Sequence, residues 1–158
     1  MKQIPLTQGK FALVDDDDYE WAIKLKWCYD CGYASIRVHK KRNGKWSGRN
    51  VRMHNLIMNT PDGMQTDHED RNKLNNQRSN LRVCTHAENQ RNKPKKLNTS
   101  SKFIGVCWSK RKSMYIAYIT INKERKHLGY FNCQTKAALA YNEAAIKYHA
   151  GFASLNNV

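Results

Sequence analysis

The chain has 158 residues, of which 28 are Lys or Arg and 13 are Asp or Glu, so its formal net charge is +15. No stretch approaches the ~18 consecutive apolar residues of a transmembrane helix, and the first residues lack the apolar segment of a secretory signal. These features predict a cytoplasmic protein without a membrane partner. The charge is uneven, because residues 1–70 hold 11 basic and 10 acidic side chains whereas residues 71–158 hold 17 and 3. The second half therefore favours a polyanionic partner such as nucleic acid.

The five cysteines predict reduced thiols, because their number is odd and no signal peptide precedes them. Cys28 and Cys31 have the spacing of half a zinc site. A structural zinc needs four ligands, however, and no second pair is spaced to supply them. We therefore interpret this pair as part of paired strands.

Short strands and turns are predicted for the N-terminal part. The expected elements are a strand over 10–14, an acidic turn over 15–18 that caps a short helix over 19–25, strands over 27–29 and 33–38 joined by a turn at 30–32, a basic loop over 40–49 with a hairpin signal at Asn43-Gly44, and a strand running into a helix over 51–58. The four carboxylates of 15–18 form either a solvated helix cap or a catalytic cluster, and the cap is the simpler interpretation.

A pair of short strands followed by a helix is predicted next, near 64–68 and 81–83, with an Asn-rich loop between the strands. Thr85 and Glu88 form a capping box, so the helix should begin at His86. Residues 93–102 contain Pro, Ser and basic residues without periodicity, as linkers do. The expected division is a strand-rich region over 1–60, a core over 61–93, a linker over 94–102 and a C-terminal domain over 103–158.

Three strands and a helix are predicted for the C-terminal domain. The strands fall near 103–108, 114–122 and 126–131, and Thr135 caps a helix that runs to about His149. One helix face is small and apolar, which suits close packing on a sheet. That face consists of Ala137, Ala138, Tyr141, Ala144, Ala145 and Tyr148. The fold class expected for the whole chain is α+β.

The segment 66–92 holds residue types suited to phosphodiester hydrolysis. His68 can take a proton from water, since an unperturbed imidazole has a pKa of about 6.5. Asp67 and the side-chain carbonyl of Asn89 are hard oxygen ligands, which suit Mg²⁺ or Mn²⁺ better than zinc. Asn80 can hold the loop and the His68 ring by hydrogen bonding. His54 lies upstream, as either a phosphate contact or an interior histidine.

The spacing of Asp67-His68, Asn80 and Asn89, together with Leu74-Asn75-Asn76-Gln77-Arg78-Ser79-Asn80-Leu81-Arg82, resembles the HNH nucleases of phages and introns in their H-N-N form. Arg52-Met53-His54-Asn55-Leu56-Ile57-Met58 is also similar to the segment that precedes the motif. The resemblance implies a ββα-metal core in which His68 is the general base, Asp67 and Asn89 bind one metal and Asn80 positions the histidine. The turn 69–72 departs from the family pattern, because Arg71 stands where a glycine is usual.

Residues 100–158 resemble the plant ethylene-response-factor (Apetala-two) DNA-binding domain. The resemblance rests on Ser101-Lys102-Phe103-Ile104-Gly105-Val106, Tyr115-Ile116-Ala117-Tyr118-Ile119, His127-Leu128-Gly129-Tyr130-Phe131 and the alanine-rich helix. It implies a three-stranded sheet that enters the major groove. The free face and turns would offer DNA Trp108, Ser109, Lys110, Arg111, Lys112, Tyr118, Thr120, Arg125 and His127. Four further DNA contacts are expected from the core, at Arg71, Arg78, Arg82 and Arg91.

Together these features predict a metal-dependent endonuclease of the homing type that acts on double-stranded DNA in a prokaryotic or phage-infected cell. Two other classes stay open. One is a non-catalytic DNA-binding regulator that uses the C-terminal sheet. The other is a nucleic-acid-packaging protein, although the basic residues lie in patterned strands and helices rather than in a low-complexity tail.

Overall fold

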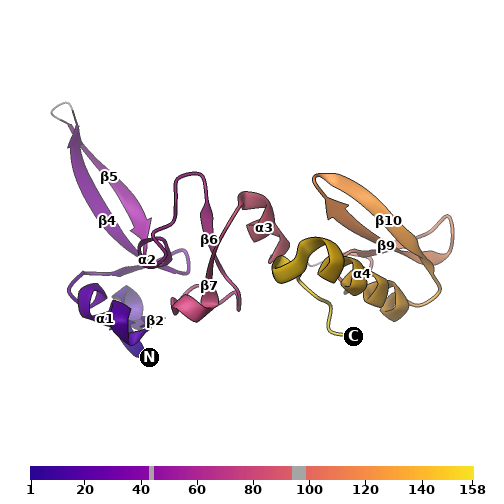
Figure 1. The fold of residues 1–158 in the computed structure, drawn as a ribbon, viewed down its shortest axis with the longest axis horizontal. Coiled ribbons are helices and arrows are strands. Elements are labelled where there is room, and N and C mark those ends of the chain that lie inside the picture. The colour runs from indigo at the N-terminus through magenta and orange to yellow at the C-terminus, as the bar shows by residue number, and fades with distance from the viewer. Residues whose placement is uncertain (43–44, 94–98) are drawn as a thin grey trace. The chain divides into compact units, whose positions relative to one another are not determined.

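A computed structural model describes residues 1–42, 45–93 and 99–158, which divide into two units, Met1–Asn89 and Gln90–Val158 (Figure 1). Both units mix helices with small antiparallel sheets. The turn signal Asn43-Gly44 and residues 94–98 of the expected linker lie outside the described residues. No helix in the described part of the chain has the length and apolar character needed to cross a membrane.

The first unit contains two small sheets and three short helices ahead of its last strand pair. Its elements are β1 (Lys2–Pro5), η1 (Thr7–Gly9), β2 (Phe11–Val14), α1 (Asp16–Ala22), β3 (Cys28–Asp30), β4 (Tyr33–Arg42), β5 (Lys45–Arg52), α2 (Met53–Ile57), β6 (Gln65–His68), η2 (Arg78–Asn80), β7 (Leu81–Cys84) and α3 (His86–Arg91). β1 pairs with β2, β3 with β4, β4 with β5, and β6 with β7, all antiparallel.

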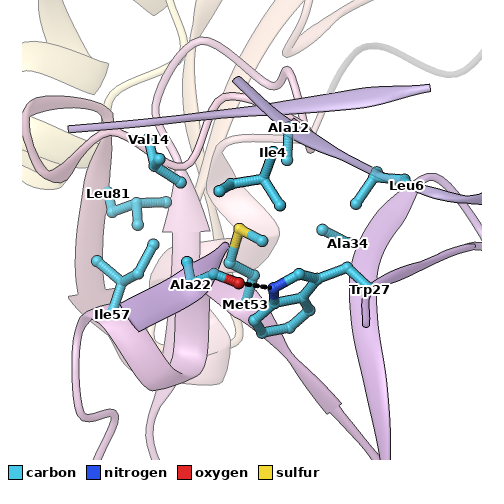
Figure 2. Close-up of a cluster of buried hydrophobic side chains, with 10 residues drawn as sticks. All are labelled: Ile4, Leu6, Ala12, Val14, Ala22, Trp27, Ala34, Met53, Ile57 and Leu81. Carbon is cyan, nitrogen blue, oxygen red and sulfur yellow. Dashed lines mark hydrogen bonds between the residues drawn. The ribbon is translucent and has the colours of Figure 1, made fainter. Parts of the chain in front are cut away.

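One apolar cluster joins these sheets (Figure 2). It is made of Ile4, Leu6, Ala12, Val14, Ala22, Trp27, Ala34, Met53, Ile57 and Leu81. Within it the indole nitrogen of Trp27 donates a 2.8 Å hydrogen bond to the carbonyl of Ala22. Leu81, the first residue of β7, contributes to the same cluster as β1 and β2, so the strands that carry the motif are anchored on the N-terminal core by burial of apolar surface.

Most expected elements of this unit are confirmed, with three differences. β1 was not expected from the sequence. The basic stretch 40–49 belongs largely to β4 and β5, because the antiparallel register of these strands runs as far as Arg42 opposite Lys45. α1 begins at Asp16, so the acidic run forms the first helical turn, where carboxylates favour the positive end of the helix dipole.

The second unit is a three-stranded sheet with one long helix. Its elements are β8 (Val106–Ser109), β9 (Met114–Ile121), β10 (Glu124–Phe131), α4 (Gln134–His149) and η3 (Ala150–Phe152), with strand order β10-β9-β8. The expected alanine-rich face is confirmed: Ala137, Ala138, Ala144 and Ala145 are buried against Val106, Ala117 and Ile119. Small side chains allow the helix to lie close to the sheet.

Gly105 shows how close this packing is. Its φ is +71°, and a Cβ placed there would collide with the ring of Tyr141 and lie 2.6 Å from the carbonyl of Tyr118. Glycine is therefore required at this position. Two expectations were wrong. The strand expected over 103–108 begins only at Val106, because residues 103–105 form a bend and turn. Thr135 does not cap the helix, because α4 already begins at Gln134, after Cys133 in extended conformation.

Candidate active site

β6, β7 and α3 bring the motif residues together as two antiparallel strands followed by a helix. Asp67 pairs in register with Arg82, and His68 pairs with Leu81. Neighbouring residues on a strand point to opposite faces. The side chains of Asp67 and His68 can therefore reach the same phosphate only if the regular strand ends there. β6 does end at His68.

The capping box at the start of α3 is confirmed. The backbone N–H of Thr85 donates to the Glu88 carboxylate at 2.8 Å, and the Glu88 N–H reaches the Thr85 hydroxyl at 3.3 Å. The helix is further tied to β6 by Gln65, which bonds to His86 at 3.1 Å and accepts a 2.7 Å hydrogen bond from the Asn89 side-chain nitrogen. Gln65 thus fixes the orientation of Asn89, a contact that sequence reasoning missed.

His68 is buried, with 5% of its surface exposed, and its ring contacts Asn76. The distance between His68 Nε2 and the Asn76 side-chain oxygen is 3.4 Å. The nitrogen of that amide donates to the Leu74 carbonyl at 3.1 Å, which orients its oxygen toward the imidazole. Since an amide oxygen only accepts, Nε2 must carry the proton, and Nδ1 becomes the basic nitrogen.

Burial is the main influence on the protonation of His68. Loss of solvation lowers the pKa of His68, although the hydrogen bond to Asn76 and the nearby Asp70 and Asp67 act in the opposite direction. The ring is therefore held neutral at physiological pH, the form in which an imidazole accepts a proton.

Two aromatic neighbours surround the His68 ring. The His54 ring lies edge-on, with 4.8 Å between ring centres, and the Tyr33 ring lies 6.1 Å away. Burial, followed by the charges of His68 and Arg52, lowers the pKa of His54 to about 3. His54 is 3% exposed, and its Nδ1 lacks a hydrogen-bond partner among the described residues. Of the two roles expected for it, the structure supports the interior histidine.

The loop between β6 and β7 is held by Asn80. Its side-chain nitrogen donates to Asp70 at 2.9 Å and to the Asn75 carbonyl at 2.8 Å, and its oxygen accepts from the Asp70 N–H at 3.0 Å. Asn80 therefore organises the loop, while the hydrogen bond to the imidazole comes from Asn76. Arg71, where the family usually has glycine, has a φ of +65°, so the turn keeps the left-handed conformation without glycine.

Two opposing effects act on the pKa of Asp70. Burial alone would raise the pKa of Asp70, but hydrogen bonds from Asn75, from the Asn72 backbone and from Asn80 outweigh it and lower the pKa. The charged carboxylate is thus built into the loop.

Asp67 lies on the other face of β6 from His68 and is paired with Arg82. The Arg82 guanidinium donates to the same carboxylate oxygen from Nε at 3.0 Å and from a terminal nitrogen at 2.9 Å. Because Gln65 and Asp67 are two residues apart on β6, their side chains share a face. Asn89, bonded to Gln65, therefore approaches the same face as Asp67.

This donor set fits a divalent cation of the Mg²⁺ or Mn²⁺ type. A carboxylate and an amide oxygen are hard ligands that leave the remaining positions to water and phosphate. Among the described residues there is no group of three His, Cys, Asp or Glu side chains that could enclose an ion. Cys28 and Cys31 are exposed free thiols.

The Asn-rich loop is joined to the N-terminal sheet. Leu13 in β2 accepts a 2.8 Å backbone hydrogen bond from Asn76 and donates one of 2.8 Å to Leu74. Asp15 accepts a 2.7 Å bond from the backbone of Arg78, whose guanidinium binds Asp18 at 2.8 and 2.9 Å. Asp18 is buried, so the acidic run is not a purely solvated cap. Its role is to hold the loop that positions Asn76.

The residues expected to contact DNA have different neighbours in the structure. Arg78 and Arg82 lie on carboxylates, Arg71 sits in the turn after β6, and Arg91 ends α3.

On the C-terminal sheet, Tyr118 pairs with His127 and Thr120 with Arg125. These four share the face opposite Ala117 and Ile119, away from α4, and we call them the open face. Their role toward DNA stays a prediction.

The remaining candidates lie at the edge of that sheet. Lys110, Arg111 and Lys112 are exposed in the turn between β8 and β9, and Ser109 ends β8. Trp108 pairs with Tyr115, and their rings touch at 4.8 Å between centres. Tyr115 packs toward α4, so alternation places Trp108 on that side of the edge strand and not on the open face.

Comparison with known proteins agrees with this site. Residues 58–91, which include β6, β7 and α3, match the HNH endonuclease family. The chain is also similar to an uncharacterized HNH endonuclease of Acanthamoeba polyphaga mimivirus, with 29% identity over 162 residues, which cover 96% of this chain and 77% of that protein.

Proposed function

We propose that this chain, which carries an HNH endonuclease domain, is a metal-dependent endonuclease that hydrolyses phosphodiesters of double-stranded DNA. The observation that carries the proposal is the environment of His68. The imidazole sits at the end of a strand, is kept neutral by burial and has its tautomer fixed by Asn76. These are the properties that a general base for water requires.

In the proposed reaction, Nδ1 of His68 takes a proton from a water molecule. The resulting hydroxide attacks phosphorus, the bond from phosphorus to the 3′ oxygen breaks, and that oxygen takes a proton from solvent water. The products are a 5′-phosphate and a 3′-hydroxyl. Asn76 keeps the imidazole in one orientation throughout. Asn80 and Asp70 keep the loop in place while the substrate enters.

Asp67 and Asn89 are the residues that would hold the metal. A bound Mg²⁺ or Mn²⁺ would neutralise negative charge on the phosphate and on the leaving oxygen. Gln65 supports this role, since it engages the nitrogen of Asn89 and so directs the amide oxygen elsewhere. Arg82 pairs with the Asp67 carboxylate at 2.9 Å.

The C-terminal sheet would contribute much of the affinity for DNA. Its open face presents a hydroxyl, a phenol, an imidazole and a guanidinium, and the sequence of residues 100–158 resembles ethylene-response-factor domains, although Tyr118 and Thr120 stand where that family has arginines. Linking this reader to the nuclease raises overall affinity through effective concentration. A homing endonuclease that acts in a prokaryotic or phage-infected cell fits this combination. The mimivirus relative supports a viral setting.

A non-catalytic DNA-binding regulator is the second candidate, and one observation favours it. Arg82 already occupies a carboxylate oxygen of Asp67, as it would in a nuclease fold kept only as a scaffold. Incubation of supercoiled plasmid with the full chain separates the two candidates. The endonuclease predicts nicked or linear product with Mg²⁺ or Mn²⁺ and none with EDTA. Binding of plasmid without cleavage under every metal condition would establish the regulator.

A further inference from the structure

Tyr33 lies beside the proposed general base, where the first strand of the long hairpin β4–β5 begins. Its ring centre is 5.3 Å from the His54 ring and 6.1 Å from the His68 ring. The Tyr33 side chain is half-buried, so the aromatic cluster reaches the surface at this residue.

Two cations share the Tyr33 ring. The guanidinium carbon of Arg52 lies 4.1 Å from the ring centre, and the ammonium of Lys73 lies 4.4 Å from it. Arg52 comes from the end of β5 and Lys73 from the loop after β6, so two distant segments converge here. Lys73 also donates to the Cys31 carbonyl at 3.3 Å.

The surroundings of this pair differ from those of the other cations near the motif. Arg78 is bound to Asp18 and Arg82 to Asp67. Over the described residues, no carboxylate lies within ion-pair distance of Arg52 or Lys73. Both are exposed. Two like charges on one ring repel each other, and the attraction of each to the ring is weak at an exposed site. An anion beside the ring, within reach of both side chains, would balance the two charges.

We propose that Arg52 and Lys73, held on the ring of Tyr33, form a phosphate clamp that binds the DNA backbone next to the phosphodiester attacked at His68. The inference rests on the proposed function for the identity of the anion. Arginine offers a planar fork and lysine a compact charge, and both bind phosphate oxygens well. The ring keeps the two side chains oriented before DNA arrives. The clamp would thus set the position of the strand relative to His68.

The first test measures DNA binding in EDTA, where no cleavage occurs. Affinity of the full chain for a duplex is measured at several salt concentrations between about 50 and 200 mM. Arg52→Gln and Lys73→Gln should each reduce the slope of log affinity on log salt by about 0.9, the value for each phosphate that the protein neutralises. Lys24→Gln and Lys26→Gln are matched controls, since both lysines are exposed in the same unit. Slopes that fall equally for all four variants, or for none, overturn the clamp.

The second test locates the contact. Single neutral methylphosphonates are placed in the duplex, one at a time, around the cleavage site. The wild type should lose affinity at one or two positions adjacent to the cut, and the same replacement should have no further effect in the Arg52→Gln, Lys73→Gln double variant. Arg52→Lys should recover part of the affinity. Equal losses in wild type and double variant overturn the proposal. A wild type that binds as described but never cleaves contradicts the nuclease function and leaves the clamp standing.

Discussion

Positive side chains have two kinds of partner, and the two units use them differently. Around the motif of the first unit, Arg78 and Arg82 lie against carboxylates, of Asp18 and Asp67, whereas Arg52 and Lys73 lie on a tyrosine ring. On the open face of the second unit, Arg125 lies 4.2 Å from the ring centre of Tyr118, and only three acidic residues are present after position 70. Total charge therefore does not locate a nucleic-acid contact. A cation on an aromatic ring keeps its charge available to phosphate, whereas a cation in a carboxylate pair has already been neutralised.

The comparison predicts that the chemistry belongs to the first unit, whereas DNA binding is shared between the clamp of the first unit and the open face of the second. Replacement of His68 by Ala should show it most strongly. A positioned general base contributes roughly 10²–10⁴-fold, so cleavage at saturating DNA should fall by that range while affinity for DNA stays within about twofold. Single-turnover cleavage and equilibrium binding measure the two quantities. His39→Ala, an exposed histidine of β4, is the control, and a His68→Ala enzyme with wild-type turnover would refute the assignment.

The metal concentration needed for cleavage should depend only on residues of the first unit. Asn89→Ala removes a proposed ligand, and Gln65→Ala removes the group that orients it. We expect each to raise the Mg²⁺ concentration needed for half-maximal cleavage by roughly 10–100-fold, the usual effect of losing a ligand's support. Metal titrations of cleavage provide the measurement. The same variants should bind DNA normally in EDTA, and an unchanged metal requirement in both would remove Asn89 from the site.

Two adjacent residues of β10 test the role of the open face directly. Arg125 lies on that face, whereas Lys126 points the other way and donates to the Tyr148 hydroxyl of α4 at 2.9 Å. Arg125→Ala should weaken DNA binding and reduce the salt slope by about 0.9, because one fewer phosphate is neutralised. Lys126→Ala removes the same charge and should change the slope less. Equal slopes for these two variants would show that net charge alone, and not the open face, determines binding.

A pH dependence of stability is also expected, and it belongs to the first unit. Burial holds the pKa of His54 near 3, well below the ordinary value of 6.5. The unfolded chain therefore binds a proton that the folded chain excludes between these values. The contribution of His54 to the free energy of unfolding is therefore fully present above pH 6.5. It is lost as the pH falls toward 3, by at most about 1.4 kcal/mol per pH unit. Urea unfolding of wild type and His54→Gln at several pH values measures this, and parallel pH profiles would contradict the assignment.

Local patterns in the sequence were sufficient for much of the motif. The capping box of Thr85 and Glu88 predicted the start of α3, and the strands expected near 64–68 and 81–83 agree with β6 and β7 to within one residue at each end. The role of Asn76 was not predictable in the same way. Several asparagines between 72 and 80 offer the same amide group, and the choice among them depends on backbone bonds to Leu13. A contact between residues so distant in sequence leaves no periodic signal.

The acidic run 15–18 illustrates the same limit. Its composition indicates a helix start, which the structure has, but its bonds to Arg78 arise from tertiary packing. The C-terminal unit was easier to predict, because its strands follow one another along the chain and its helix has a single apolar face. Thr135 was misplaced as a cap by two residues, since the helix begins after Cys133 without a side-chain cap.

The backbone bonds between Leu13 and the 74–76 loop have a consequence for engineering. Residues 58–91 alone would leave behind Leu13, which holds Asn76, together with Asp15 and Asp18, which hold Arg78. Residues 58–91 therefore cannot be transferred by themselves. A graft of this segment onto another protein would contain His68 and both proposed metal ligands, but it would lose the edge of β2 that positions Asn76 and, through it, the imidazole. A chimera built from this protein should keep β1, β2 and α1 together with the motif.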